Sequence, residues 1–191
     1  TDLLGSLVNS TDADGNPPTN HRIRSEAVSL FFAGYATVAL TLTFAALLLA
    51  VNRSHLQRLR RKARETLGGR QPTFDDLSKL GFARQVAEET LRLYPVSNML
   101  DRRAVVDTEI GGYHIPAGTA LIFSAWLAHR DARYFPNPLE FDPDRFAPDR
   151  RREIPADAYF PFGDGRHVCV WNRFALMQIS MVLIVWAQHW D

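Results

Sequence analysis

Residues 160–169 read FPFGDGRHVC, and this short stretch decides how the rest of the chain is interpreted. Gly163 and Gly165 stand one residue apart, which permits a tight loop and a close approach of the backbone to a flat or bulky group. The loop delivers Cys169 to the start of a helix that we expect to run to the C-terminus. The helix dipole and two neighbouring basic residues favour the thiolate form of this cysteine. A thiolate in this position acts either as a metal ligand or as a nucleophile.

Cys169 is the only cysteine among the 191 residues, which excludes an intrachain disulfide and a multi-cysteine zinc site. The neighbouring His167 lies too close in sequence to complete an ordinary zinc site. No cysteine-hydrolase signature surrounds the thiol, so a nucleophilic role has no evident base. An inert, buried cysteine is the alternative for this residue taken alone.

The composition is that of an ordinary globular protein. Of the 191 residues, 46% are hydrophobic and 23% are charged, and the formal net charge is +1. A net charge so near zero argues against a dedicated nucleic-acid binder, whose surface would be strongly basic. The length suggests one domain, because domains usually contain roughly 100–200 residues.

The most apolar segment comprises residues 27–51, which include no charged residue. At about 1.5 Å per residue, a helix of this length reaches across a membrane. The alternative is a long helix through the core of a large protein. A domain of 191 residues rarely has a core deep enough to hide such a helix on all sides. The segment therefore gives a first indication that the sequence belongs to a larger fold.

Two shorter helices are expected next. The first has Ser54 as its N-cap and ends at Gly68, with one apolar and one basic face. The basic face is either solvated or a docking surface for an acidic partner. Thr73 and Asp76 have the spacing of a capping box, and a second helix is expected over residues 82–94. The basic face of the first helix consists of Arg53, Arg58, Arg60, Arg61, Lys62 and Arg64.

Beyond residue 95 the pattern changes to short strands and turns. Strands are expected at residues 105–106, 108–115 and 119–123. Residues 131–161 contain six prolines, and segments with so little regular structure are uncommon and usually functional or disordered. Six aromatic residues in the same segment favour order through packing. The sequence thus predicts a mainly α fold with small β-sheets, of the α+β class.

The loop at residues 160–169 resembles the haem-thiolate loop of the cytochrome P-450 family, whose pattern is FGxGxHxCxG. The resemblance implies that the loop binds haem b and that Cys169 is the axial ligand of its iron, a thiolate that favours O–O cleavage. It also implies that His167 hydrogen-bonds a haem propionate. Arg102 stands where many family members place a second propionate-binding arginine; the alternative is an ordinary loop arginine. The matching positions are Phe162, Gly163, Gly165, His167 and Cys169.

Two further stretches resemble motifs of the same family. Residues 89–92 (ETLR) resemble the ExxR of helix K, where Glu and Arg share a helix face. Residues 143–146 (PDRF) resemble the PERF-type segment, whose arginine joins that pair. The resemblance implies a structural triad of Glu89, Arg92 and Arg145 that pins the proline-rich meander against helix K. The alternative for the pair alone is a surface ion pair of little energetic value.

Residues 33–37 (AGYAT) resemble the AGxxT of helix I, which crosses the distal face of the haem. The resemblance implies that Gly34 lets oxygen or substrate approach the backbone, and that the Thr37 hydroxyl organises proton delivery to bound dioxygen. A threonine in a helix more often bonds its own preceding carbonyl, which is the alternative for Thr37. Four motifs in the family's order favour a core helix over a membrane span for residues 27–51.

Three positions depart from the family pattern. Ala36 stands where the family usually has an acid, which removes one member of the proton relay. Trp171 replaces a glycine that lets the following helix approach the porphyrin, so its indole would crowd the haem. Gln178 stands where helix L often carries Glu. These departures motivate the alternative of a degenerate, non-catalytic relative.

The resemblance covers residues 1–191 but less than half of a family chain. The expected structure is a single incomplete domain: helices I, J, K and L with the meander and the cysteine loop. The N-terminal helices and the final β-hairpin are expected to be missing. Such a partial fold would expose large apolar faces. We therefore expect the isolated chain to bind haem poorly or not at all.

The complete protein implied by the resemblance is a monooxygenase that inserts one atom of dioxygen into a small apolar organic substrate. Its electrons would come from a ferredoxin or a flavoprotein reductase, docked near the basic residues 58–64 and 150–152. The sequence looks like a soluble, bacterial-type member, for which a cytoplasmic location is expected and nucleic acid is not a partner. A single-pass membrane protein spanning residues 27–51 is the least favoured alternative.

Overall fold

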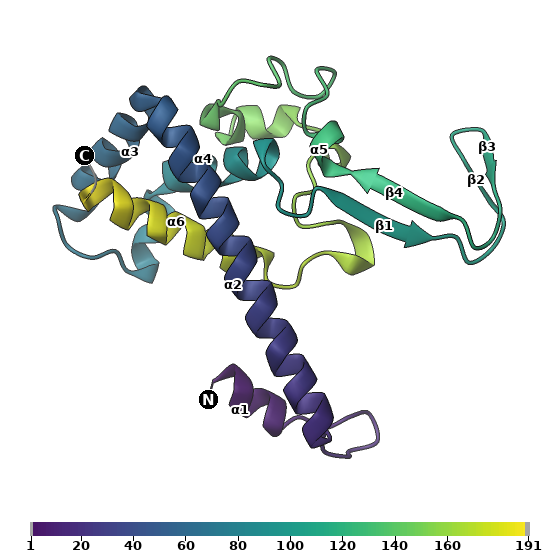
Figure 1. Cartoon of the computed structure of the whole chain (residues 1–191). Coiled ribbons are helices and arrows are strands. Elements are labelled where there is room, and N and C mark those ends of the chain that lie inside the picture. The colour runs from purple at the N-terminus through teal and green to yellow at the C-terminus, as the bar shows by residue number, and fades with distance from the viewer. Residues whose placement is uncertain (1, 190–191) are drawn as a thin grey trace. The chain divides into compact units, whose positions relative to one another are not determined.

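The computed structural model describes residues 2–189, and the chain divides into two compact units, residues 1–39 and residues 40–191. The first unit contains helix α1 (Leu3–Val8) and the beginning of helix α2 (Asn20–Val51), drawn in purple and blue in Figure 1. All remaining helices and strands belong to the second unit, in which α2 ends.

In the first unit, α1 is capped by the Asp2 carboxylate, which accepts a hydrogen bond from the Gly5 N–H at 2.7 Å. The part of α2 in this unit carries exposed aromatic side chains, with the rings of Phe31 and Tyr35 stacked 5.9 Å apart. Among the described residues, α2 is the one helix long and apolar enough to cross a membrane. The core helix of a soluble protein meets the same criterion.

In the second unit, the end of α2 contributes Leu42, Ala45, Leu48 and Leu49 to the core. Helix α3 (Arg53–Leu67) buries one apolar face and ends at Gly68, whose φ of 58° is the left-handed conformation that favours glycine. The prediction of Ser54 as its N-cap was wrong: Asn52 occupies that position. α2 ends only at Val51, so the chain turns at once into α3.

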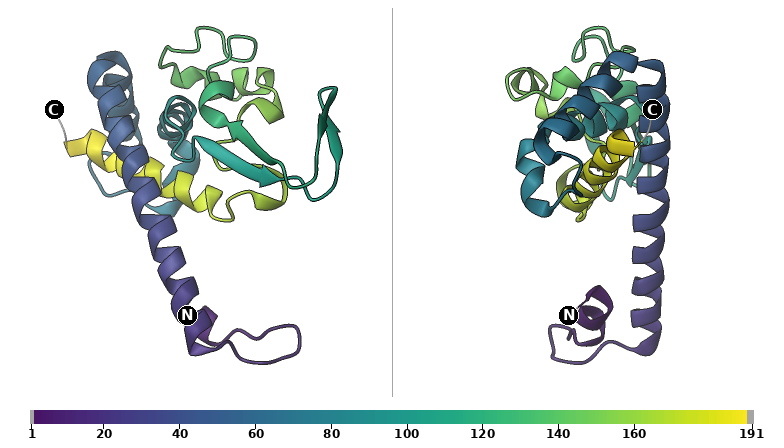
Figure 2. Two further views of the ribbon diagram at one scale, coloured as in Figure 1. Left: turned by 45° about the vertical axis from the view of Figure 1, so that its right-hand side comes forward. Right: turned by 90° about the vertical axis from the view of Figure 1, so that its left-hand side faces the viewer.

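Helix α4 (Gly81–Leu93) and helix α6 (Asn172–His189) form the centre of this unit with α3. α6 packs against both α3 and α4, as the views in Figure 2 show. α4 is close to its expected limits and is buried along almost its whole length. α6 begins at Asn172 rather than near Cys169, because the backbone at the cysteine still belongs to the loop.

A short 3-10 helix, η1 (Phe74–Lys79), precedes α4. Its start is the predicted capping box. The Thr73 side chain accepts a hydrogen bond from the Asp76 backbone N–H, and the Asp76 carboxylate accepts one from the Thr73 backbone N–H. Arg70 adds a salt bridge to the same carboxylate at 2.6 Å. The hydrogen bonds from Arg70 and Thr73 lower the pKa of Asp76. The capping-box prediction is confirmed.

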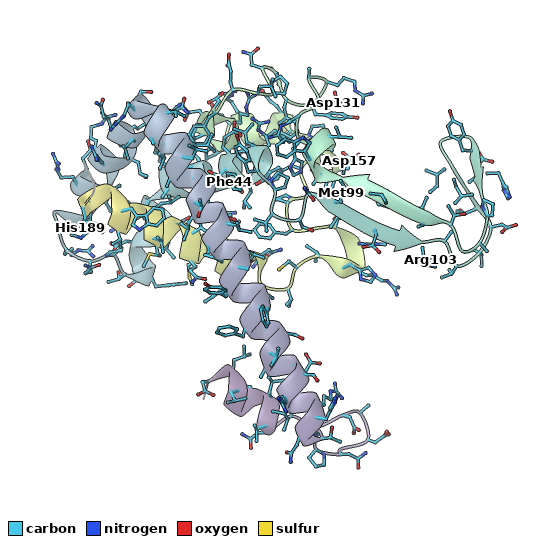
Figure 3. The ribbon with its side chains drawn as sticks, viewed as in Figure 1. Phe44, Met99, Arg103, Asp131, Asp157 and His189 are labelled. Atoms are coloured by element: carbon cyan, nitrogen blue, oxygen red, sulfur yellow. The ribbon has the colours of Figure 1, made fainter. Side chains whose placement is uncertain are left out.

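Two small antiparallel sheets follow α4. Strand β1 (Met99–Arg103) pairs with β4 (Ala120–Ser124), and β2 (Thr108–Ile110) pairs with β3 (Tyr113–Ile115). Figure 3 labels Met99 and Arg103 at the two ends of β1. The expected strand at residues 105–106 is wrong, since these residues form a bend between the sheets, and β1 was not predicted. The short helix α5 (Ala125–Ala128) follows β4.

The proline-rich segment is ordered. Phe135, Phe141 and Phe146 are buried, which confirms the expectation that aromatic packing holds this segment. Its regular structure consists of single 3-10 turns, which suit closely spaced prolines because these supply no N–H donors. These turns and the next are η2 (Pro143–Phe146), η3 (Arg150–Glu153), η4 (Ala156–Ala158) and η5 (Gly165–His167).

Candidate functional site

The centre of the second unit is a buried ion pair on α4. Arg92 Nε lies 2.7 Å from Glu89 Oε2, and Arg92 Nη2 lies 2.8 Å from Glu89 Oε1. Both side chains are 0% exposed. The alternative of a weak surface pair therefore does not apply, because removal of one partner would leave an uncompensated charge in the interior.

Arg145 from η2 reaches the same carboxylate, with its Nε 3.4 Å from Glu89 Oε1. The backbone N–H of Asp142 also donates to this oxygen, at 2.9 Å. The structure thus brings together the three residues of the expected triad. Every group that contacts the Glu89 carboxylate is a donor, which is the arrangement that suits its ionised form. Burial raises the pKa of Glu89, whereas the hydrogen bonds and charges of Arg92 and Arg145 oppose that rise.

The two arginines also hold the meander by its backbone. Arg92 donates to the carbonyl oxygens of His129, Pro138 and Glu140 at 2.7, 2.7 and 3.0 Å. Arg145 donates to the carbonyl oxygen of Asn137 at 2.8 Å. Because guanidinium groups carry five donors in a fixed plane, two side chains are enough to fasten a segment that lacks regular structure.

The cysteine loop is closed by a backbone hydrogen bond from the Cys169 N–H to the Phe162 carbonyl oxygen at 2.8 Å. Gly163 and Gly165 have φ values of 76° and 63°, in the left-handed region. A Cβ on Gly163 would lie 3.3 Å from the carbonyl oxygen of His167, so the loop is tight at this point. The thiol of Cys169 is exposed at the end of the loop.

A Gly163→Ala substitution is expected to destabilise the loop more than Gly165→Ala does. Each change places a side chain at positive φ, which costs about 1–3 kcal/mol. Only the Cβ at position 163 also meets a backbone carbonyl, whereas the space around position 165 is open. Urea unfolding of the two variants measures the difference. Equal losses would contradict the steric reading of Gly163.

His129 is a residue that the sequence analysis missed. It follows α5, is 0% exposed, and accepts a hydrogen bond at Nε2 from the Phe160 N–H at 3.0 Å. The rings of Tyr159 and Phe160 lie 5.2 Å from the imidazole. Burial lowers the pKa of His129 to about 4, so the ring is neutral at pH 7. Only its place at the end of an apolar stretch, residues 119–128, could have drawn attention to it.

The two residues expected at the haem propionates lie in the second unit. Arg102 stands on β1, half-buried, and donates to the carbonyl oxygen of Asp101 at 2.7 Å. His167 ends η5 and is exposed. Both are available to an anionic group that approaches the loop or the strand, since neither forms a salt bridge among the described residues.

Thr37 and Gly34 lie on the part of α2 that belongs to the first unit. The Thr37 hydroxyl donates to the carbonyl oxygen of Ala33 at 2.6 Å, which is the helix-internal bond common for threonine. A Cβ at Gly34 would meet nothing within 4 Å. The backbone of this turn is therefore accessible within its own unit.

Three of the residues that follow Cys169 carry exposed apolar side chains. Val170 is 83% exposed, and Trp171 and Phe174 are 43% and 52% exposed. The rings of Trp171 and Phe174 meet edge to face at 6.1 Å. The indole of Trp171 is the bulkiest of these side chains.

Part of the basic face of α3 forms contacts within the unit, rather than being solvated or free for docking as the sequence predicts. Arg58 forms a salt bridge with Asp144 at 2.6 Å and lies 4.0 Å from the centre of the Phe82 ring, so it serves packing. Arg150 likewise pairs with Asp142 at 2.9 Å. Three other arginines of this face line a shallow hollow formed by Gln57, Arg60, Arg61, Arg64 and Glu65.

Comparison with known proteins agrees with the motifs. The family model for Cytochrome P-450 matches residues 1–191. A cyclooctat-9-en-7-ol 5-monooxygenase of Streptomyces melanosporofaciens is 36% identical over 190 residues, which is 99% of this chain and 41% of that protein. Cytochrome P-450 3A14 of Cavia porcellus is 36% identical over 195 residues, 100% of this chain and 39% of the relative.

A solved structure, the haem domain of a cytochrome P-450DA mutant, superposes with a TM-score of 0.92 at 31% identity. The match covers 98% of this chain and 43% of that one. The fold is that of part of a cytochrome P-450 haem domain, and the chain belongs to the cytochrome P-450 family. It spans about two fifths of the length of these relatives.

The residues present fit the haem that the family implies. Cys169 offers an exposed thiol as a donor, and the apolar side chains beside it suit a porphyrin face. Among residues 2–189, no three His, Cys, Asp or Glu side chains are grouped to hold a metal ion by themselves. The loop offers one sulfur donor, which matches the single cysteine ligand of this haem class.

Proposed function

We propose that this chain provides the thiolate-ligand side of a haem-thiolate monooxygenase. The observation that carries the proposal is the exposed Cys169 thiol, at the end of a glycine loop closed by the bond from Cys169 N–H to the Phe162 carbonyl oxygen. In the proposed reaction, one atom of dioxygen enters a small apolar substrate. The other atom leaves as water, with two electrons from a redox partner and two protons from solvent.

The residues of the chain have separate tasks in this proposal. Haem bound at the loop supplies the chemistry of oxygen activation, and Cys169 would hold its iron. His167 and Arg102 would bind the propionates as hydrogen-bond donors. Thr37 would present its hydroxyl to the proton path, beside the open backbone at Gly34. The ion pairs of Glu89 keep the meander and the loop in place.

The test is the Cys169→Ser variant of the protein expressed from its complete reading frame. The absorption band of reduced, CO-bound haem distinguishes a thiolate ligand from a neutral one. We expect the thiolate band in the wild type and its loss in C169S, while Ser54→Ala on the exposed start of α3 keeps it. An unchanged band in C169S would overturn the proposal.

Trp171 is expected to limit haem binding. Overpacking costs about 1–3 kcal/mol, so relieving it with Trp171→Gly is expected to raise haem affinity by about fivefold or more. Trp171→Phe keeps much of the bulk and should stay near the wild type. Haem titration followed by absorbance measures the affinities. If Trp171→Gly binds haem no more tightly than the wild type, the indole does not crowd the haem.

We propose that a ferredoxin or flavoprotein reductase docks on the exposed basic surface at Arg61 and Arg64. Their positive charge suits an acidic redox protein and would steer its encounter. Charge reversal of both to Glu should slow haem reduction by the partner, more so at low salt. Arg103→Glu on β1 is the control. Unchanged reduction in the double variant would exclude this surface. A cytoplasmic location is proposed with this partner, although the relatives include mammalian proteins.

A further inference from the structure

His129 connects the two halves of the candidate site. Its carbonyl oxygen accepts a hydrogen bond from Arg92 Nη1 at 2.7 Å, and its Nε2 accepts one from the Phe160 N–H at 3.0 Å. Two residues beyond Phe160, the Phe162 carbonyl oxygen receives the Cys169 N–H at 2.8 Å. One residue thus fastens the ion-pair cluster with its backbone and the start of the cysteine loop with its side chain.

The hydrogen bond at Nε2 defines the state of the ring. An imidazole nitrogen that accepts from a backbone N–H carries no proton, so the neutral ring must carry its proton on Nδ1. Nδ1 faces backbone groups of Leu91 and Arg92, but no hydrogen bond of normal geometry joins it to them. The surroundings are the aromatic rings of Phe135, Tyr159 and Phe160. Such a pocket could be filled by an apolar side chain if packing were the only requirement.

We propose that His129 is a positioning residue, which sets the geometry of the Cys169 loop by accepting the Phe160 N–H. The inference rests on the proposed function in one respect: it is the binding of haem iron by Cys169 that would require a fixed loop geometry. Pro161 follows Phe160 and supplies no N–H. Within the loop, the Phe160 carbonyl oxygen accepts the Gly163 N–H at 3.1 Å and the Phe162 carbonyl oxygen accepts the Cys169 N–H, so the bond to His129 is the one that ties this end of the loop to the rest of the unit. Without the imidazole acceptor, the Phe160 N–H would be buried unpaired or would move.

Three substitutions separate hydrogen bonding from packing. In His129→Gln, the side-chain oxygen reaches the place of Nε2 and keeps an acceptor. His129→Met has the same length, but its thioether is a much weaker acceptor. His129→Asn is polar, but its oxygen reaches only the place of Nδ1. We therefore expect the Gln variant to behave like the wild type and the other two to differ from it.

The first measurement needs no haem. The rate at which Cys169 reacts with a pyridyl disulfide reports the geometry of its loop. Losing the hydrogen bond is expected to change this rate by about fivefold in H129M and H129N, with H129Q within about twofold of the wild type. Near-ultraviolet circular dichroism selects the variants that fold, and if H129M fails, H129N decides. Equal rates in all proteins, or equal changes in all three variants, would overturn the inference.

The second measurement uses the haem-loaded protein from the complete reading frame. The share of reduced, CO-bound haem with the thiolate band should fall in H129M or H129N and be restored in H129Q. If C169S keeps that band, the proposed function fails, yet the thiol rates still decide the role of His129. If C169S loses the thiolate band but Cys169 reacts at the same rate in the wild type and all His129 variants, the proposed function stands and the proposed role of His129 is wrong.

Discussion

Replacing Glu89 by Gln is expected to lower the free energy of unfolding by about 3–5 kcal/mol, because it leaves two buried arginines without a counter-charge. Arg92 and Arg145 are 0% and 4% exposed, so water cannot solvate them in place of the carboxylate. The amide also presents N–H donors to guanidinium donors. Urea unfolding followed by tryptophan fluorescence, in the protein from its complete reading frame, measures the loss.

The chain offers a matched control for this change. Glu65 on α3 pairs with Lys62 at 3.2 Å, and both side chains are about half exposed. Exposed pairs of this kind are worth about 0.2–1 kcal/mol, so Glu65→Gln should change the free energy of unfolding by no more than that. Equal losses in Glu89→Gln and Glu65→Gln would show that the buried cluster has no special energetic role.

The expected consequence of losing Glu89 reaches beyond α4. Arg92 holds two carbonyl oxygens of the meander and Arg145 holds a third, while both are oriented by the same carboxylate. Without it, the guanidinium groups lose the partner that fixes their planes. The meander and the cysteine loop that follows it should then loosen together. Hydrogen exchange of their backbone amides would rise in Glu89→Gln and stay low in Glu65→Gln.

The sequence predicted those features that depend on neighbours along the chain. The pair Glu89 and Arg92 lies three apart on one helix, and the capping box of Thr73 and Asp76 has the same spacing, so the spacing predicts that each pair can form. Only the resemblance to the family indicated that the first pair belongs to a structural triad. The loop at residues 160–169 was recognisable from its glycines and cysteine. The mainly α fold with small sheets followed from the same local patterns and agrees with the superposition on a family structure.

What the sequence could not predict depends on contacts between distant segments. Arg58 pairs with Asp144 across 86 residues, and His129 meets Phe160 across 31. No spacing rule links such residues, so the sequence alone places the arginine on a solvated or docking face and indicates no role for the histidine. β1 was missed for the same reason: its sequence, MLDRR, gains its strand conformation from pairing with β4.

The second large effect is a loss of stability in mild acid that depends on His129. Its pKa is about 4 in the folded protein and about 6.5 in the unfolded chain, mainly because burial disfavours the charged ring. The unfolded state therefore binds a proton first as the pH falls. The contribution of His129 is fully present above pH 6.5 and is lost between pH 6.5 and about 4. At about 1.4 kcal/mol per pKa unit, it amounts to about 3 kcal/mol.

Other titratable groups near the imidazole do not produce the same loss of stability between pH 6.5 and about 4. Arg92 on α4 and Arg130 after α5 stay charged throughout this range, and the pKa of Tyr159 is raised well above it. Burial raises the pKa of Glu88, so this carboxyl group adds stability as the pH falls, with the opposite sign. Both carboxyl groups of residues 88 and 89 are present in the wild type and in the His129 variant, so their titration cancels from the difference between the two proteins.

His129→Gln isolates the histidine, since it removes the titrating ring and keeps the acceptor for Phe160. Between pH 7 and pH 4.5, we expect the wild type to lose about 2–3 kcal/mol more of its free energy of unfolding than His129→Gln does. Urea midpoints at half-unit pH steps measure both curves. Parallel curves would mean that the imidazole is already protonated, or solvated, in the folded protein. A divergence that begins near pH 6.5 instead identifies a buried, neutral ring, the form in which Nε2 accepts a hydrogen bond from the Phe160 N–H.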